Sequence, residues 1–134
     1  MKFNRFNKKN CQNKRNGIAA IRINEKGLIS FSWKLYQMLN PEGKELIYVE
    51  FLQNQDSPKD WYIIRSTEEE GFPLRGKKDT KSSMFNSAAL TKQLIELVRQ
   101  PGDDRTRFTL RVIDKPQQLA ENMEGWLLIT KPLS

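Results

Sequence analysis

The sequence predicts an α+β fold that is mainly β, with two short helices, and three observations lead to this prediction. Stretches with strand character and stretches with helical periodicity follow one another in the order strand, strand, helix, strand, strand. The same order occurs a second time further along the chain. Each helical stretch is followed by a proline and a glycine, which stop a helix. A unit of this size cannot close its own core, so we expect two tandem ββαββ units that complete one another.

The distribution of charge divides the chain of 134 residues into an arm and a domain. Residues 1–17 carry six basic and no acidic side chains, whereas the rest of the chain carries 17 basic and 16 acidic side chains. The arm also has too few apolar residues to be ordered by packing. We therefore predict a flexible basic arm, residues 1–17, and a single domain, residues 18–134, made of the pseudo-repeats 18–66 and 71–134.

The first unit begins with a predicted hairpin and a short helix. Strands over residues 18–23 and 28–31 are joined by a turn at Asn24–Gly27, where the glycine permits a positive φ. Ser32 is the predicted cap of a helix over residues 33–40. The buried side of this helix is expected to carry Leu35, Met38 and Leu39.

Two further strands complete the first unit, over residues 46–52 and 61–65, with a polar loop at 54–59 between them. The first of these strands alternates, and its apolar positions should face inward: Ile47, Val49 and Phe51. The acidic stretch 67–71 is predicted to be a solvated hinge between the two units.

The second unit repeats this order. Residues 72–75 and 82–85 are predicted to form a hairpin with a basic tip at 76–81. Asn86 or Ser87 caps a helix that runs to Gln100, with a predicted buried stripe of Leu90, Leu94, Leu97 and Val98. The remaining predicted elements are a strand over residues 107–113, a polar excursion at 115–124 and a strand over residues 125–129.

The first unit resembles the swapped-hairpin family of bacterial transcription factors typified by AbrB and MraZ. The residues that carry the resemblance are Ile29, Phe31, Ser32, Leu35, Leu39, Gly43 and the turn at Gly27. The resemblance implies two copies interleaved into one small barrel-like domain that binds DNA. This chain has Gly27-Leu28 where the family has Gly-Arg, and Ser32 where it has proline; its helix carries Lys34 in place of several arginines. The segments Pro58–Tyr62 and Gly71–Arg75 are also similar to those of small uncharacterised Bacteroides-type proteins, which implies no activity.

The residues that most enzymes use are scarce. The chain has no histidine, the commonest general base and metal ligand, and Cys11 is its single cysteine. It has no glycine-rich phosphate loop and no nucleophile elbow, and its paired carboxylates fall in predicted loops. No apolar run is long enough to span a membrane. We therefore expect a cytoplasmic protein that is not an enzyme and holds no cofactor or metal.

The strongest signal for binding is the position of the basic residues. The residues expected to bind nucleic acid are Lys8, Lys9, Lys14, Arg15, Arg22, Lys26, Arg75, Lys77, Lys78 and Lys81. They lie on the arm and at the two predicted hairpins, where a two-stranded ribbon could present them to phosphates. The alternative interpretations are a solvated tail for the arm and lysines that keep an exposed turn soluble. Five aromatic residues could stack on single-stranded bases, although their positions favour the core or its rim: Trp33, Tyr36, Trp61, Tyr62 and Trp126.

Together these features predict a DNA-binding protein of the transcription-regulator type that contacts the phosphates of duplex DNA. The alternative is a protein-interaction module of a mobile-element or toxin–antitoxin system without catalytic activity, which the nearly neutral domain favours. A protein partner or a homodimer fits either interpretation.

Overall fold

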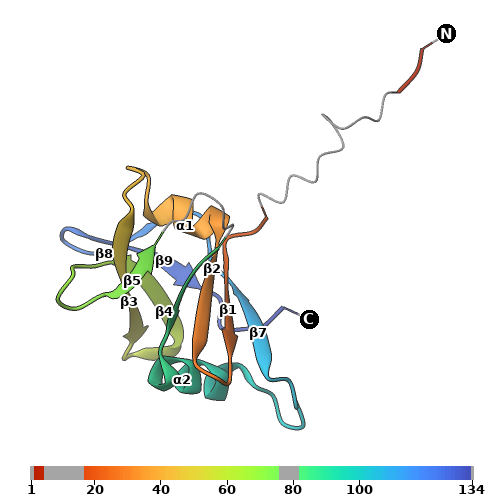
Figure 1. The fold of residues 1–134 in the computed structure, drawn as a ribbon. Coiled ribbons are helices and arrows are strands. Elements are labelled where there is room, and N and C mark those ends of the chain that lie inside the picture. Colours follow the sequence, from red (N-terminus) through yellow and green to blue (C-terminus); the bar gives the residue numbers. More distant parts are fainter. Residues whose placement is uncertain (1, 5–16, 76–81, 134) are drawn as a thin grey trace.

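The fold is mainly β and is described by a computed structural model for residues 2–4, 17–75 and 82–133. The chain runs through β1 (Ala20–Asn24), β2 (Leu28–Ser32), α1 (Trp33–Leu39), β3 (Leu46–Asn54), β4 (Ser57–Arg65), β5 (Phe72–Arg75), β6 (Ser82–Asn86), α2 (Ala88–Val98), β7 (Arg107–Arg111), β8 (Gln117–Ala120) and β9 (Met123–Leu128). These elements confirm the predicted α+β class (Figure 1).

The strands form two antiparallel sheets in which the two halves of the chain are interleaved. Sheet A has the order β6-β2-β1-β7, and sheet B has the order β5-β3-β4-β9-β8. In each sheet two strands of the first half lie in the centre, flanked on both sides by strands of the second half. Neither half therefore contains a complete sheet of its own, as expected for halves that are too small to close a core.

The two sheets do not close into the small barrel that the family resemblance implies. At one side they meet through an isolated bridge between Val112 and Leu128, next to a hydrogen bond from the Ile113 amide to the Leu127 carbonyl. At the other side β5 and β6 lie in different sheets, and Ser83 Oγ donates a hydrogen bond to the Arg75 carbonyl oxygen at 2.9 Å. Both junctions are local contacts and not continuous ladders, so the architecture is two sheets packed face to face.

A single hydrophobic core fills the space between the sheets. Its aromatic contacts cross from one sheet to the other: Phe31 meets Phe51 edge to face at 6.1 Å between ring centroids, and Phe72 stacks on Phe85 at 4.5 Å. The two helices lie at opposite ends of the molecule (Figure 1), and each buries apolar side chains in this core. Leu35 and Leu39 come from α1, and Leu94 and Val98 come from α2.

Several local predictions are confirmed. Ser32 caps α1, since its hydroxyl accepts the Leu35 amide, and Ser87 caps α2 in the same way. Gly27 has a φ of 97°, which glycine adopts at no steric cost. On β3, Ile47 and Val49 are buried, and Phe51 packs against the core.

Other local predictions are wrong. The buried face of α2 carries Thr91, Leu94, Ile95 and Val98, so the predicted stripe through Leu90 and Leu97 is rotated towards its edge. The polar loop at 54–59 is shorter than predicted, because β3 extends to Asn54 and β4 begins at Ser57. The polar excursion at 115–124 contains a strand, β8, that pairs with β9.

The predicted hairpin of residues 72–75 with 82–85 is also wrong as a strand pair. β5 pairs with β3, and β6 pairs with β2, so the two strands belong to different sheets. The proposed basic tip, residues 76–81, lies outside the described residues. The core explains the difference, because β5 and β6 each bury apolar side chains against a strand of the first half.

Candidate nucleic-acid interface

The outward positions of sheet A form a surface, the sheet A face, without an acidic residue. The inward positions of its strands are buried, so the alternate positions point away from the core. Strand register places these positions in three transverse rows: Arg111, Ala20 and Ser32; Thr109, Arg22, Ser30 and Met84; Arg107, Asn24, Leu28 and Asn86. The face therefore combines three arginines with hydroxyl and amide residues and with the apolar Ala20, Leu28 and Met84. Arginine, Ser30, Thr109 and the amide residues are of the types that bind phosphate and sugar oxygens.

The three arginines lie close together on adjacent strands. Arg22 on β1 is directly opposite Thr109 on β7, so Arg107 and Arg111 are its two diagonal neighbours. Diagonal neighbours lie about 7–8 Å apart, and Arg107 and Arg111 are about 14 Å apart along β7. We call these three residues the arginine row. All three residues are exposed, and the described part of the chain offers no carboxylate within ion-pair distance of any of them. The row is therefore available to anions in solution.

Three other arginines are used to hold the fold together. Arg65 pairs with Glu124, Arg99 with Glu25, and Arg105 with Asp103. Each guanidinium also lies over an aromatic ring: Arg65 over Trp126, and both Arg99 and Arg105 over Phe108. These contacts separate structural arginines from the arginines of the sheet A face.

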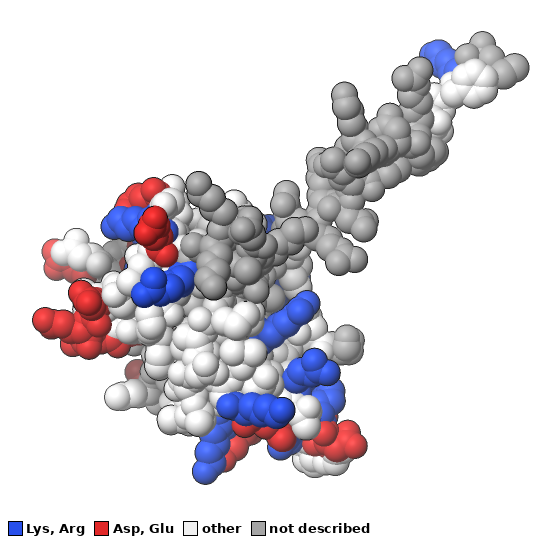
Figure 2. Space-filling model, viewed as in Figure 1, with Lys and Arg blue, Asp and Glu red and all other residues white. Residues whose placement is uncertain are grey.

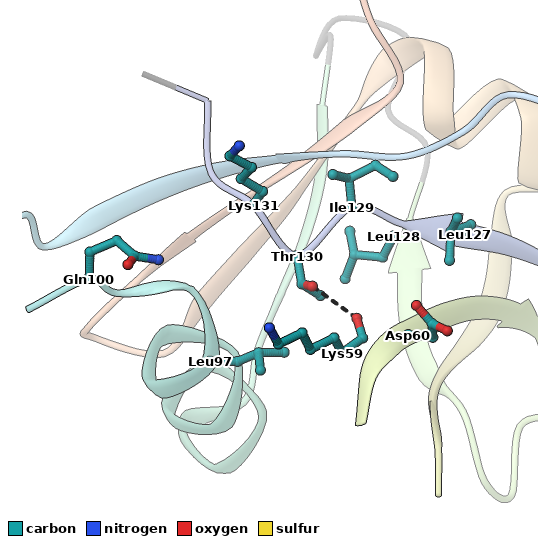
Figure 3. A pocket seen from close by; sticks show the side chains of 9 residues that line it. All are labelled: Lys59, Asp60, Leu97, Gln100, Leu127, Leu128, Ile129, Thr130 and Lys131. Carbon is teal, nitrogen blue, oxygen red and sulfur yellow. Dashed lines mark hydrogen bonds between the residues drawn. The ribbon is translucent and has the colours of Figure 1, made fainter. Parts of the chain in front are cut away.

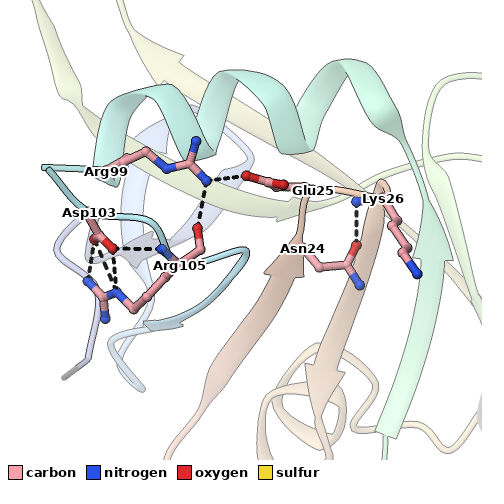
Figure 4. Close-up of polar contacts among 6 residues, drawn as sticks. All are labelled: Asn24, Glu25, Lys26, Arg99, Asp103 and Arg105. Carbon is pink, nitrogen blue, oxygen red and sulfur yellow. Dashed lines mark hydrogen bonds and ion pairs between the residues drawn. The ribbon is translucent and has the colours of Figure 1, made fainter. Parts of the chain in front are cut away.

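The Arg99 and Arg105 pairs form one network at the end of the molecule that holds α2 (Figure 4). Arg99 donates from the end of α2 to Glu25 in the β1–β2 turn and to the Arg105 carbonyl oxygen at 2.6 Å. Arg105 donates to both carboxylate oxygens of Asp103, from Nε at 3.0 and 3.1 Å and from Nη2 at 2.8 Å. The hydrogen bonds from Arg105 lower the pKa of Asp103 from 3.8 to about 2. The network fixes the β1–β2 turn against the segment that leads into β7.

Of the residues predicted to bind nucleic acid, the structure describes three, and it separates them. Arg22 lies in the middle of the sheet A face and is exposed. Lys26 is exposed at the β1–β2 turn, beyond the row that contains Arg107. Arg75 ends β5 in sheet B. Lys8, Lys9, Lys14, Arg15, Lys77, Lys78 and Lys81 lie outside the described residues.

The sequence segments that carry those seven residues nevertheless join the described structure at one end of sheet A. Ile18, next to the arm, accepts a hydrogen bond from Ser32 Oγ at 3.1 Å. Ser82, the first described residue after segment 76–81, pairs with Ser32. Arg111 lies opposite Ala20 in the same transverse row. The arginine row therefore runs towards the points where two basic segments enter the fold.

Arg107 and Arg111 were not among the residues that the sequence predicted. Their alternation with Phe108 and Leu110 shows that they point outward, but not which strand lies next to β7. The β1–β7 pairing, which joins positions about 90 residues apart, brings them beside Arg22. The signal that could have found them is that two of the three outward positions of this strand are arginines.

Charge is divided between the two sides of the molecule. In Figure 2, acidic side chains gather at the left, on the side of sheet B, with a few basic ones among them at the upper left, and the two kinds mix again along the lower edge. The surface over β1 and β2 carries no acidic side chain in this view. Residues 42–70, which contain β3 and β4, carry eight acidic and three basic side chains. Acidic side chains therefore outnumber basic ones around β3 and β4.

A pocket of about 390 Å³ lies between the end of α2 and the ends of β4 and β9 (Figure 3). It is lined by Lys59, Asp60, Leu97, Gln100, Leu127, Leu128, Ile129, Thr130 and Lys131. The Thr130 hydroxyl donates to the Lys59 carbonyl oxygen at 2.9 Å, which joins the two strand ends. The amines of Lys59 and Lys131 point in different directions in Figure 3, so the pocket does not present a converging set of charged groups.

Two features are absent from the described residues. No helix among them is long and apolar enough to cross a membrane, and no group of three or more acidic or cysteine side chains there could hold a metal ion. The resemblance to the AbrB and MraZ family stays a prediction from the sequence, because no family model, no curated protein and no solved structure matches the chain.

Proposed function

We propose that this protein binds DNA through the sheet A face, in the manner of a transcription regulator, without catalysis and without a cofactor. The observation that carries the proposal is the row of Arg22, Arg107 and Arg111. These arginines are exposed, have no ion pair within the described structure, and stand on a surface without acidic positions. The proposal includes a cytoplasmic location, where DNA is accessible.

The spacing of the row supports contacts with a phosphate backbone. Arginines at intervals of about 7–8 Å can each reach a separate phosphate, and guanidinium groups bind phosphate oxygens in a bidentate manner. Ser30 and Thr109, on either side of Arg22, add hydroxyl groups that suit backbone oxygens. Neither type of contact reads base sequence, so the face supports affinity and orientation on the duplex more than specificity.

The two basic segments extend the proposed surface. Residues 1–16 carry six basic side chains, and segment 76–81 carries Lys77, Lys78 and Lys81 against one aspartate. Since both join the fold at the Arg111 end of the face, they can follow the same duplex beyond the sheet. Their contribution should be electrostatic and therefore sensitive to salt.

The test is fluorescence anisotropy of a labelled duplex of random sequence, titrated with the full chain at low salt. We expect a complex at micromolar protein that dissociates as the salt concentration rises. An unchanged anisotropy at micromolar protein and low salt would overturn the proposal.

A further inference from the structure

The outward positions of sheet B form a second surface, the sheet B face, which is apolar where a solvated sheet is usually polar. Strand register places Leu52, Tyr62 and Leu127 side by side on three adjacent strands. Ile64 lies in the next row, opposite Gly125. Leu119 covers that glycine, since a Cβ built there would lie 2.4 Å from Leu119 Cδ1. The described helices make their main contacts with strands of sheet A, so neither helix covers this face.

Acidic side chains border the apolar surface on the side of β3, and the exposed Arg75 stands on the same face opposite Leu46. Glu50 stands in the Ile64 row, where it accepts a hydrogen bond from Ser66 Oγ at 2.6 Å. The turn between β4 and β5 carries Glu68, Glu69 and Glu70, all exposed. This turn lies against the face, since a Cβ built at Gly71 would lie 2.6 Å from the Cβ of the outward-facing Tyr48. An occupant of this face should therefore be basic and should also carry apolar or aromatic side chains.

The chain itself contains a segment with this composition. Residues 1–16 hold six basic side chains, no acidic side chain, and two phenylalanines, Phe3 and Phe6. Phe3 is 79% exposed in this structure. Lysine and arginine can also lie over the rings of Tyr48 and Tyr62, which adds cation–π attraction to the ionic contacts.

We propose that residues 1–16 dock on the sheet B face through their basic and phenylalanine side chains. The segment is long enough to do so on its own domain. Sixteen extended residues span roughly 50 Å, whereas a domain of this size has a radius of gyration of about 13 Å. Docking would withhold the arm from DNA, so DNA and the sheet B face would compete for the same segment. The inference does not rest on the proposed function, because arm docking is measurable without nucleic acid.

The experiment uses Cys11, the single cysteine of the chain, as the attachment point for a nitroxide spin label. Amide spectra of the labelled full chain are recorded at low salt with the label oxidised and then reduced. We expect a loss of peak intensity in the oxidised state that is concentrated at Tyr48, Leu52, Tyr62 and Leu127. A loss that is spread evenly over the domain, concentrated on sheet A, or absent would overturn the proposal.

Two matched variants test the chemistry of docking. Glu68→Gln/Glu69→Gln/Glu70→Gln should restore the intensity at these amides. Glu96→Gln/Asp104→Asn/Asp114→Asn, which neutralises three exposed acids elsewhere, should leave the intensity loss in place. Equal effects of the two variants would contradict a specific acidic site. Mixing spin-labelled chains with isotope-labelled chains distinguishes docking within one chain from docking on a second copy, and either result supports the proposal.

Discussion

At the scale of single residues, Ser32 joins three parts of the fold. Its hydroxyl accepts the amides of Ala20 at 3.0 Å and Leu35 at 3.3 Å, and donates to the Ile18 carbonyl oxygen at 3.1 Å. A serine hydroxyl has one donor and two acceptor sites, so all of them are used. The residue thus caps α1 and also fixes the start of β1, beside the junction with the arm.

Replacement of Ser32 should therefore cost more than the loss of a helix cap. We expect Ser32→Ala to lower the free energy of unfolding by about 2 kcal/mol, because the cap and the link to β1 are both lost. Ser87→Ala is the matched control: among the described residues this hydroxyl accepts only the Leu90 amide, so its loss should cost about 1 kcal/mol. Urea denaturation of both variants measures the difference, and equal costs would contradict the role of Ser32 in holding β1.

Asp103 provides a residue-scale prediction about pH. Its pKa of about 2 lies below its ordinary value of 3.8 because Arg105 stabilises the carboxylate. A lowered pKa means that the ion pair contributes stability above pH 3.8, and that this contribution is lost as the pH falls towards 2. Carbon-detected NMR titration should show the low pKa in the wild type and a value near 3.8 in Arg105→Gln. A pKa that does not change with this substitution would show that the pair does not form in solution.

At the scale of elements, the β1–β2 hairpin and α2 depend on close approach at Gly27. The Gly27 carbonyl oxygen accepts the Ser87 amide at 2.8 Å, at the position that caps α2. A Cβ at Gly27 would lie 3.2 Å from the Ala88 backbone nitrogen. Together with the Arg99–Glu25 pair at the far end of α2, this contact fixes the helix along the hairpin turn.

A comparison of two glycines distinguishes the energetic effect of this contact from that of backbone strain. Gly27 and Gly102 both have positive φ, but no atom lies within 4 Å of a Cβ built at Gly102. Gly102→Ala should cost about 1 kcal/mol of unfolding free energy from backbone strain, and Gly27→Ala about 1 kcal/mol more from the displaced helix. Thermal and urea unfolding test this order. Equal losses of unfolding free energy in the two variants would mean that α2 can shift away from the hairpin without an energetic cost.

The elements show how far local sequence patterns predict this fold. Caps, turns and alternation are properties of neighbouring residues, and they correctly located α1 and most strands. The face of α2 was misjudged because Leu90 and Leu97 are as apolar as the buried Ile95, so apolar character does not choose between the two stripes. Thr91 is buried with its hydroxyl donating to the Ser87 carbonyl oxygen at 3.1 Å, which apolar periodicity does not anticipate. β8 was missed because it has only four residues, two of them glutamines, within a polar stretch, and its pairing with β9 supplies the strand. Strand partners such as β5 with β3 are long-range choices that no local pattern contains.

At the scale of the whole molecule, interleaving of the two halves creates both surfaces. The sheet A face combines Arg22 from the first half with Arg107 and Arg111 from the second. The sheet B face combines Leu52 and Tyr62 with Leu127 in the same way. The sequence could therefore indicate Arg22 as a candidate, but not which residues lie beside it. The tertiary pairing of β1 with β7 determines the rest of the candidate site.

The salt dependence of DNA binding tests the central claim most directly. It is compared among the wild type, Arg22→Gln/Arg107→Gln/Arg111→Gln, and the equal-charge control Lys59→Gln/Lys92→Gln/Lys115→Gln, whose residues are exposed away from the sheet A face. If the three arginines each contact a phosphate, the slope of log Kobs against log salt should become less negative by about 2.7 in the arginine variant. Its affinity should be at least tenfold weaker. The control should keep the wild-type slope. An unchanged slope in the arginine variant, or an equal fall in both variants, would contradict the assignment of DNA binding to the sheet A face.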